Sequence, residues 1–374
     1  NNSAFLPWHR GYLLQPEADT GTTPFEFTVT LPEPARQVGT IDYTLVHGTT
    51  NDDDFFGPLN GTLTIPPGAS SGTIEVLIQG DTDIEPIEDF RLDFSNPQGL
   101  ILGTSEATGR ILDNDTTFTV DIESDTVDAN PGDGSAFDAD GKTSLRAAIM
   151  EANALAGSQS IQVPAGNYTL SLPGVNEDGG ASGDLDITAS DLAIIGVGKN
   201  VTTINGSGLD RILDLKDAGN VQLVGLTLTD GAAANVDPTT QEDGGAIRSR
   251  NSHLSLYQVT VRDNRATGDG GGIAIIEGSD LRMVDTRVTD NVAGNYGGGI
   301  VVEDGTAVLD HSRVDNNRLA EDRLGGGIAS WGRLLVTGSV IHDNSAQHGA
   351  GIYAADEAVI ETSGYRLADP DPNP

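Results

Sequence analysis

The stretch GGGIAIIEGSDLRMVDTRVTDN, residues 270–291, decides the fold of most of this chain. It returns as GGGIVVEDGTAVLDHSRVDNN at 297–317, and shorter echoes of its first letters end at Ile247, Ile328 and Ile352. Four of the units close on an Asn turn, VRDN, VTDN, VDNN or IHDN, which ends at Asn264, Asn291, Asn317 and Asn344. The spacing is about 26 residues, a period that is typical of solenoids.

Each unit contains three short strand patterns separated by three turns. Apolar side chains alternate with polar ones, as at Leu254, Leu256, Val259 and Val261, and these four are expected to face inward. Glycine pairs and β-branched residues exclude one long helix. The pattern predicts a right-handed parallel β-helix with rungs about 4.8 Å apart. Equivalent Asn side chains should stack in a ladder, and the Gly pairs should form tight corners with positive φ.

These repeats resemble those of polymorphic outer-membrane proteins and of the wider pectate-lyase-like superfamily. A single helix is predicted before them, over Ser144–Leu155, because its apolar residues have helical spacing and Thr143 or Ser144 can cap it. The string TSLRAAIMEANA resembles the CSLREAI motif that introduces many bacterial secreted β-helices, with Thr143 in place of the Cys and Ala147 in place of the Glu. The resemblance implies a short helix that caps one end of the solenoid.

The first third of the chain carries a different pattern. The segments FEFTVTL, IDYTLV, GTLTIP, GTIEVLIQG, FRLDFSN and EATGRILDND alternate apolar and polar residues between short turns. This spacing predicts an antiparallel sandwich. From PEADTGTTPFEFTVTL to ATGRILDND the order of features resembles the Calx-β family of calcium-binding sandwiches. The expected fold class is therefore all-β, an antiparallel Calx-β sandwich followed by a right-handed parallel β-helix with one short capping helix.

Carboxylates gather in the turns of this first module. Ca²⁺ takes six to eight oxygen ligands from such loops, whereas carboxylates crowded together without a cation are costly. The resemblance implies calcium as the cofactor and the following ligands: Glu17, Asp54, Asp81, Glu85, Asp113 and Asp115. A solvated acidic rim is the alternative interpretation. A second acidic loop, with Asp128, Asn130, Asp133, Asp138 and Asp140, lacks the spacing of an EF-hand and is interpreted as an ordinary turn.

The patterns divide the chain into five segments. We expect an N-terminal arm at 1–13, the sandwich at 14–117, a loop and capping helix at 118–160, the β-helix at 161–365 and a linker-like tail at 366–374. Because the chain has no initiator Met and ends in LADPDPNP, we expect a trimmed product of a multidomain protein.

Composition restricts the function. The 374 residues carry a formal net charge of −36, which disfavours nucleic acid and anionic membrane surfaces as partners. No apolar run approaches the roughly 20 residues of a membrane span. The absence of Cys is compatible with a bacterial surface protein. We therefore expect a secreted or cell-surface protein without direct membrane insertion.

The opening string FLPWHRGYL, residues 5–13, resembles a signature of type-3 copper proteins such as tyrosinases. A type-3 centre takes six His ligands from a helical bundle. The chain has six His in all, and only His9 lies in the string. A copper centre is therefore not expected, and the string is either coincidental or the remnant of a fused domain.

Polar residues form columns on the outward side of the predicted β-helix. Alignment on the Asn turns places Thr260, Arg287, Arg313 and Val340 in one column; Gln258, Asp285, His311 and Gly338 in the next; and Arg262, Thr289, Asp315 and His342 in a third. The weak catalytic candidates are Asp285, Arg287, His311, Arg313 and Asp315. A lyase base or a pair of hydrolase carboxylates is one interpretation, and favourable charge pairs between neighbouring rungs are the other. Tyr257, Tyr296, Trp331 and Tyr353 are the main aromatic candidates for sugar stacking.

The sequence favours a non-enzymatic, calcium-binding structural or adhesion module of a bacterial multidomain protein. A polysaccharide lyase or hydrolase that uses the outward face of the β-helix is one alternative. An accessory subunit of a larger extracellular assembly is another. Expected partners are other extracellular proteins or cell-surface glycans.

Overall fold

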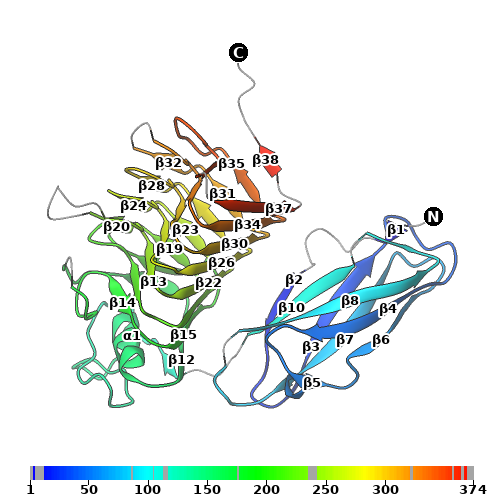
Figure 1. Cartoon of the computed structure of the whole chain (residues 1–374). Helices are drawn as coiled ribbons and strands as arrows, with labels where there is room; N and C mark the ends of the chain where they lie inside the picture. Colours follow the sequence, from blue (N-terminus) through cyan, green and yellow to red (C-terminus); the bar gives the residue numbers. More distant parts are fainter. Residues whose placement is uncertain are drawn as a thin grey trace. The chain divides into compact units, whose positions relative to one another are not determined.

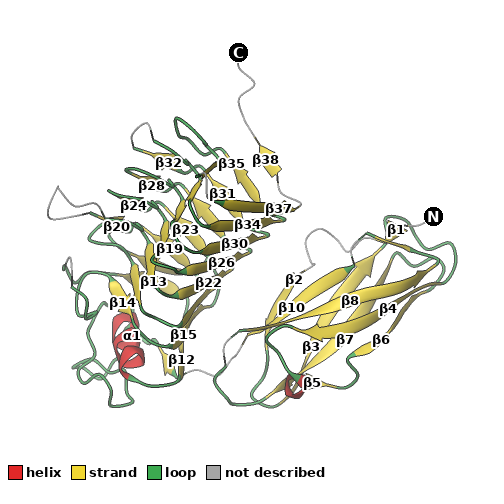
Figure 2. Cartoon of the chain, viewed as in Figure 1, coloured by secondary structure: helices red, strands yellow, loops and turns green. Residues whose placement is uncertain are grey.

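The computed structural model describes residues 3–4, 12–85, 87–103, 105–112, 117–174, 177–234, 242–320, 323–355, 358–363 and 366–368. The chain divides into two compact units, residues 1–115 and 116–374. It is 49% strand and only 4% helix, which confirms the predicted all-β fold class. Figure 2 shows how strands dominate both units. Residues 5–11 of the FLPWHRGYL string, including His9, lie outside the described residues.

The first unit is a sandwich of two main sheets (Figure 1). One sheet has the order β2 (Tyr12–Pro16), β10 (Glu106–Leu112), β8 (Glu88–Gln98), β4 (Gly39–His47) and β6 (Asn60–Ile65). The other has the order β3 (Gly21–Thr30), β7 (Ser71–Gly80) and β5 (Phe55–Phe56). A short pair joins β1 (Ser3–Ala4) to β9 (Ile101–Leu102). The strands pair antiparallel, as predicted, except that β2–β10 and β1–β9 are parallel.

Period-two alternation forms the core of the sandwich. In β7, Ile74, Val76 and Ile78 are buried, whereas Glu75 between them is exposed. The rings of Phe25 and Phe27, from the other side of the sandwich core, pack on Phe90 of β8 with centroids 5.9 and 6.0 Å apart. The apolar face of each strand therefore meets the opposite sheet.

The second unit is a right-handed parallel β-helix built from three long sheets and one short one. The first solenoid sheet contains β11 (Phe118–Thr119), β12 (Ser158–Val163), β15 (Asp191–Gly196), β18 (Asn220–Val224), β22 (His253–Tyr257), β26 (Asp280–Val284), β30 (Thr306–Asp310), β34 (Arg333–Thr337) and β37 (Val359–Ser363). The second contains β13 (Gly166–Thr169), β16 (Thr202–Asn205), β19 (Thr227–Thr229), β23 (Thr260–Arg262), β27 (Arg287–Thr289), β31 (Arg313–Asp315), β35 (Val340–His342) and β38 (Arg366–Ala368).

The third solenoid sheet contains β14 (Leu185–Ile187), β17 (Leu213–Lys216), β21 (Ile247–Arg250), β25 (Ile273–Ile276), β29 (Ile300–Val302), β33 (Ile328–Ser330) and β36 (Ile352–Ala354). The short sheet contains β20 (Ala232–Ala233), β24 (Arg265–Ala266), β28 (Val292–Ala293) and β32 (Arg318–Leu319). Figure 1 shows the rungs stacking in chain order, from green near α1 to red at β38. The predicted inward residues, such as Leu256 and Val261, are fully buried in a continuous core.

The Gly motifs make the corners for two separate reasons. Gly270, the first residue of its GGGI motif, has φ +63°, a left-handed conformation that glycine adopts without strain. The next glycine, Gly271, has no room for a side chain, since a Cβ there would lie 2.3 Å from the carbonyl oxygen of Gly298 on the following rung. The Ile that ends the motif, Ile273, is fully buried. The motif therefore sets the corner and anchors it to the core.

The Asn side chains form the predicted ladder. The Nδ2 group of Asn264 donates to Oδ1 of Asn291 at 3.0 Å, Asn291 donates in the same way to Asn317 at 2.9 Å, and Asn317 donates to Asn344 at 3.0 Å. Each receiving oxygen also accepts the backbone N–H of the Asn one rung before it. The ladder satisfies turn groups that the sheets leave without partners.

Helix α1 (Leu145–Ala154) covers one end of the solenoid, as predicted. Ser144 is its N-cap and accepts the backbone N–H of Ala147 at 3.0 Å. The guanidinium of Arg146 lies beneath the helix and is fully enclosed. It donates twice to Asp125, at 2.6 and 3.3 Å, and three times to the backbone carbonyls of Gly180, Gly183 and Asp184. All five of its N–H groups are satisfied, so Arg146 joins the cap to the loop before β14.

Within the described residues, no helix has both the length and the apolar character that crossing a bilayer requires.

Candidate functional site

A short 3-10 turn, η1 (Asp52–Asp54), positions one carboxylate at an end of the sandwich. Asn51 caps the turn, because its side chain accepts the backbone N–H of Asp53 at 2.9 Å. The backbone N–H of Asn51 donates in return to Oδ2 of Asp54 at 2.6 Å. This reciprocal capping holds Asp54 in a single orientation.

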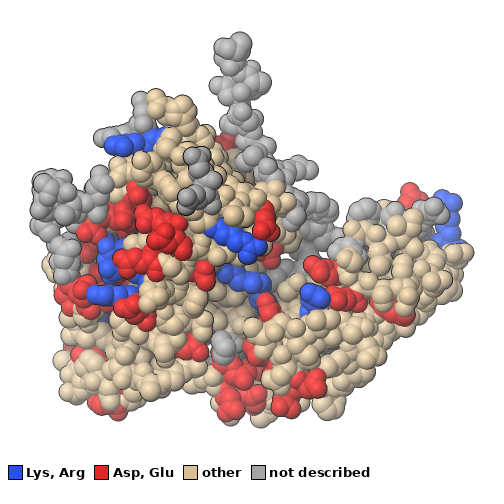
Figure 3. Space-filling model, in the orientation of Figure 1, with Lys and Arg blue, Asp and Glu red and all other residues tan. Residues whose placement is uncertain are grey.

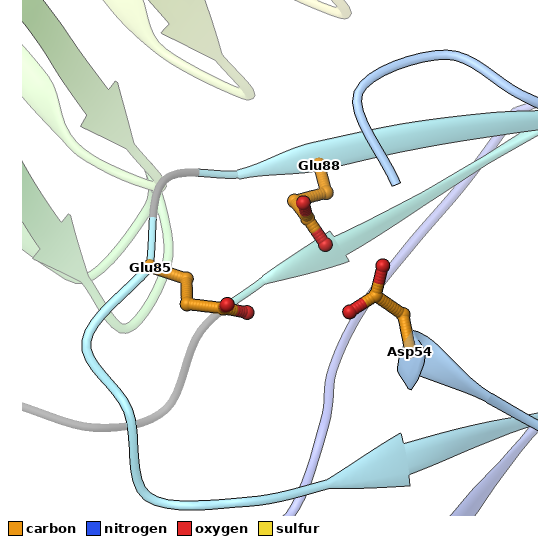
Figure 4. Close-up of side chains that lie close together, drawn as sticks. All are labelled: Asp54, Glu85 and Glu88. Carbon is orange, nitrogen blue, oxygen red and sulfur yellow. The ribbon is translucent and has the colours of Figure 1, made fainter. Parts of the chain in front are cut away.

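Asp54 lies beside two further carboxylates, those of Glu85 and Glu88. One oxygen of each of the three side chains lies within 4.8 Å of the others. Figure 4 shows the three carboxylates pointing toward one another, Glu85 from the loop before β8 and Glu88 from the first residue of that strand. The Asp54–Glu85–Glu88 triad thus joins the turn at η1 to the start of β8.

The triad concentrates negative charge where water is partly excluded. Asp54 is buried, and Glu85 and Glu88 are half-buried. Burial first, and then the charges of Asp54, Glu85 and Glu17, raise the pKa of Glu88 to about 8. At neutral pH the site therefore holds a proton where a hard cation with oxygen ligands would fit. The donor set suits Ca²⁺, and Asp54, Glu85 and Glu88 would hold it.

The six ligands predicted from the sequence fall in different places. Asp54 and Glu85 belong to the triad, and Glu17 is buried close enough to act on the charge of Glu88. Asp81 is exposed and accepts the backbone N–H of Asp83 at 2.8 Å. Asp113 and Asp115 lie outside the described residues. Glu88 belongs to the same acidic loop as Asp81, Asp83 and Glu85 in the sequence, but it is not among the six ligands that the resemblance implies.

The acidic loop before α1 is built as ordinary turns. Asp128 accepts the backbone N–H of Asn130, and Asp138 accepts those of Asp140 and Lys142. Glu151 of α1, fully buried, accepts the backbone N–H groups of Gly132 and Gly134. These contacts engage Asp138, Glu151 and one oxygen of Asp128 with backbone N–H groups, as in ordinary turns.

The structure places the weak catalytic candidates around a buried aspartate. The carboxylate of Asp315 is fully buried and accepts Nη2 of Arg287 at 2.7 Å and Nε of Arg313 at 2.6 Å. Although burial opposes ionisation, the hydrogen bonds from these two arginines lower the pKa of Asp315. His311 pairs instead with Asp310 at 2.6 Å. Asp315 thus pairs with Arg287 of the neighbouring rung and with Arg313 of its own strand, and both guanidinium groups stay partly exposed.

Asp285 and His311 occupy a turn ladder rather than a sheet face. Both have positive φ, 47° in each case, as do Gln258 and Gly338 in the same column. The other two predicted columns follow the sheet register, with Thr260 paired to Arg287 and Arg262 paired to Thr289. Asp285 therefore lies in the turn before β27, whereas Asp315 lies at the end of β31.

A charged cleft lies elsewhere, on the outward side of the third solenoid sheet near α1. Three side chains of one outward column, Asp186, Asp214 and Arg248, come from the neighbouring strands β14, β17 and β21. Beside them is a cleft of about 300 Å³ lined by acidic and basic side chains, among them Asp184, Asp214, Glu242, Arg211, Arg248 and Arg250. Figure 3 shows acidic and basic side chains intermixed on the solenoid around β14, β20 and β24. We call this the charged cleft.

Ion pairs in the charged cleft are short and largely buried. Asp214 accepts Nη2 of Arg248 at 2.6 Å and Nη2 of Arg250 at 2.8 Å. Glu242 accepts Nη2 of Arg211 at 2.6 Å and Nη1 of Arg248 at 2.9 Å. Asp178, Asp186 and Asp214 also form a group whose oxygens lie within 4.8 Å of one another. Because the arginines already neutralise Asp214, this second group suits a cation less well than the triad does.

Carboxyls of the charged cleft differ in protonation. Burial raises the pKa of Asp184 to about 8, in spite of Arg211 nearby. Burial also raises the pKa of Asp186 to about 7, with the charge of Asp214 adding to the effect. Burial likewise opposes ionisation of Asp214, but the hydrogen bond from Arg248 and the charges around it lower its pKa. Protonated and ionised carboxyls therefore lie side by side at neutral pH.

These shifts predict that the solenoid loses stability as pH rises. Unfolded Asp184 loses its proton near pH 4, whereas the folded form keeps it to about pH 8. The folded state thus binds more protons between these values, so the free energy of unfolding falls as pH increases. The melting temperature of the parent should be higher at pH 5 than at pH 7 through this effect. In Asp184→Asn we expect that difference to be smaller by on the order of 5 °C. Melting curves of the full chain at a series of pH values check this, with Asp140→Asn, an exposed aspartate, as the control. An unchanged pH profile in Asp184→Asn contradicts the assignment.

Sequence reasoning did not find the charged cleft. Its aspartates occur in the irregular early rungs, where DLDIT and RILDLK differ from the later repeat. The available signal was a run of charged residues at outward positions of apolar strands, such as Asp214 between Leu213 and Leu215. This signal indicates a cluster only when the register of the neighbouring rungs is known.

An aromatic row lies farther along the same sheet. The rings of Tyr296 and Trp331 have centroids 5.1 Å apart, and those of Trp331 and Tyr353 have centroids 6.0 Å apart. All three rings are half-buried and pack on the buried side chains of Ala274, Val301 and Ala329. Tyr257, the fourth aromatic candidate, is buried in β22 of another sheet.

No protein-family model matches the sequence, and no curated protein matches it either. Among solved structures, the apo form of the Calx CBD1 domain is 28% identical over 28% of this chain and 92% of that chain, with a TM-score of 0.25. The CBD12 structure from CALX1.2 is 26% identical over 32% of this chain and 47% of that chain, with a TM-score of 0.28. The pectin methylesterase from Aspergillus niger is 13% identical over 67% of this chain and 89% of that chain, with a TM-score of 0.34. The chain is similar to these structures over parts of its length, and no family is assigned to it.

Proposed function

We propose that this chain is an extracellular, non-enzymatic structural or adhesive module of a bacterial protein, and that its sandwich unit binds calcium at the Asp54–Glu85–Glu88 triad. The observation that carries the proposal is the meeting of three buried or half-buried carboxylates at one end of the sandwich. The resemblance of residues 16–115 to Calx-β sandwiches supports the choice of ion.

Calcium at the triad would act as a link between two segments that are distant in sequence. Asp54 belongs to η1, whereas Glu85 and Glu88 belong to the loop before β8 and its first residue. A bound cation replaces the repulsion among these carboxylates by attraction to a common centre. The end of the sandwich therefore becomes more rigid and more resistant to unfolding when calcium is present.

Two features support a structural or adhesive role for the solenoid. Its repeats stack by backbone hydrogen bonds and a buried Asn ladder, an arrangement that favours an extended, stable surface. In the candidate catalytic cluster, the buried carboxylate of Asp315 is already paired with two arginines. Extracellular proteins and cell-surface glycans are the partners that we propose.

Calcium is expected to raise the melting temperature of the sandwich unit, with Asp54→Asn abolishing the rise. At a calcium concentration about 100 times the Kd, binding contributes about 2.7 kcal/mol, or roughly 10 °C or more for a domain of this size. Calorimetry of the full chain with calcium or EGTA measures the shift. Asp53→Asn is the matched control, because Asp53 lies in the same turn with an exposed side chain outside the triad.

A calcium-dependent shift that survives in both Asp54→Asn and Glu88→Gln places the ion elsewhere. Equal melting temperatures in calcium and EGTA exclude calcium binding by the folded sandwich.

The non-enzymatic part of the proposal has its own test. We expect no unsaturated products and no new reducing ends when the chain is incubated with uronate-containing and neutral polysaccharides in calcium. Turnover that disappears in Arg313→Ala overturns this part and assigns activity to the Asp315 cluster. Turnover that disappears in Asp186→Asn assigns it to the charged cleft.

A further inference from the structure

The charged cleft and the aromatic row lie along one face. Arg250 pairs in register with Ile276, and the same outward column continues at Glu303 and Trp331, one residue beyond the paired ends of β29 and β33. Arg250 and Trp331 are therefore three rungs apart, about 14 Å. A ligand that extends over a few sugar residues along the sheet meets both.

Polar groups of the charged cleft do not favour a charged ligand. Asp214 accepts three arginine N–H groups and Glu242 accepts two, so these two carboxylates have little negative charge left for a cation. Arg211 and Arg248 are engaged in turn by these carboxylates, so they have little attraction left for an anion. The chain as a whole, at −36, repels polyanions.

A hydroxyl-rich, uncharged ligand suits a cleft whose carboxylates and arginines are already paired with each other. A hydroxyl group donates to a carboxylate oxygen and accepts from a guanidinium N–H at the same time. Within the described residues, Arg250 gives a hydrogen bond only through Nη2, to Asp214, and its side chain is 20% exposed at the cleft. It therefore keeps donor capacity for a ligand oxygen.

The aromatic row supplies the second element of such a site. Trp331 lies between Tyr296 and Tyr353, and both contacts are edge-to-face, so its orientation is fixed by neighbours. Small buried side chains beneath the row form an apolar floor. A fixed, half-buried indole is a suitable platform for the apolar face of a sugar ring.

We propose that this face of the solenoid binds a neutral, linear saccharide, with hydroxyl groups hydrogen-bonded in the charged cleft at Arg250 and a sugar ring packed on Trp331. The proposal deepens the adhesive part of the proposed function and rests on it, because it names the class of cell-surface partner and the residues that contact it.

The test is titration calorimetry of the full chain with neutral linear hexasaccharides of glucose, mannose, galactose or N-acetylglucosamine, with hexagalacturonate as the anionic comparison. We expect at least one neutral hexasaccharide to bind. Arg250→Gln should weaken that binding about tenfold or more, since it removes a hydrogen bond from a charged donor. Trp331→Ala should weaken it by a similar factor. Arg333→Gln is the control, because Arg333 is exposed on the first solenoid sheet.

Three outcomes overturn the proposal: no neutral hexasaccharide binds, hexagalacturonate binds in their place, or binding is unchanged in both Arg250→Gln and Trp331→Ala. Circular dichroism of each variant verifies that it is folded. The Trp331 variant leaves the ion pairs of the cleft intact, so it tests the site even if Arg250→Gln disturbs them.

Failure of this proposal is distinguishable from failure of the calcium proposal. Saccharide binding should persist in EGTA and in Asp54→Asn, because the triad lies in the other unit. The calcium-dependent melting shift should persist in Arg250→Gln. Saccharide binding that requires calcium and survives in Asp54→Asn contradicts the metal-free site argued above.

Discussion

Replacing Arg146 by Ala is expected to lower the free energy of unfolding of the solenoid by about 3–5 kcal/mol, the largest effect of any single change considered for this chain. The substitution leaves the carboxylate of Asp125, which is only 2% exposed, without its cation. It also removes the donors from three carbonyl groups in the loop before β14. The effect is large because the carboxylate and the carbonyl groups that lose their donors are all buried, where water cannot replace the lost hydrogen bonds.

Urea unfolding of the full chain, followed by circular dichroism, measures this loss. Arg146→Lys should give an intermediate result, because an ammonium group keeps the charge but has three donors in place of five. Arg333→Ala is the matched control, since the pair of Arg333 with Glu361 is half exposed and contributes at most about 1 kcal/mol. An Arg146→Ala protein as stable as its parent shows that the capping helix holds without this network.

The same substitution should also affect the charged cleft. The loop that Arg146 holds carries Asp184, and the backbone N–H of Gly180 in that loop donates to Asp186 at 2.8 Å. A variant that stays folded in mild conditions is therefore expected to lose saccharide binding as well. The capping helix and the charged cleft are therefore connected through the loop that Arg146 holds.

Replacing Asn317 by Ala is expected to cost about 3 kcal/mol of stability. Asn317 is fully buried, and its amide donates to the carbonyls of Val288 and Asp315 and to Asn344. Its oxygen accepts two N–H groups from Asn291. Alanine leaves these groups without partners in the middle of the ladder, where water does not easily replace the amide.

Thermal melting of the variant beside Asn220→Ala checks the prediction. Asn220 lies in β18 with an exposed side chain, so its replacement should change stability by no more than about 0.5 kcal/mol. If the two variants melt together, the ladder contributes less than its hydrogen bonds indicate. Because repeats contact only their neighbours, the loss at Asn317 should be greatest in the rungs on either side.

The sequence alone was sufficient for the parts of the fold that repeat. Period-two alternation determined which residues face inward, and the spacing of Gly and Asn located the corners. These features depend on local backbone geometry, so each rung can be recognised from its own residues. Gly270, Ile273 and Asn291 show this for one rung. For the same reason the N-cap could be narrowed to Thr143 or Ser144, and the structure selects Ser144.

The sites were only partly predictable. Asp54, Glu85 and Glu88 all stand out as acidic residues in turns, but the sequence does not show that these three meet, because the start of β8 comes beside η1 only in the folded sandwich. The Asp315 cluster was located in the correct columns, yet its chemistry was undecided until the arginine contacts were known. Charge pairing on an outward face depends on the side-chain conformations in the folded protein. The sequence pattern does not specify these conformations.

The sequence by itself determined the solenoid, its corners and its core, because a short period repeats the same local choice at every rung. Only the tertiary structure decided the Asp54–Glu85–Glu88 triad, the network around Arg146 and the charged cleft, because their members lie many residues apart. Arg146 meets a carbonyl 38 positions away at Asp184, and Asp214 meets Arg248 across 34 positions. The physical reason is that register between irregular rungs is set by packing of the whole unit, and electrostatic contacts depend on that register.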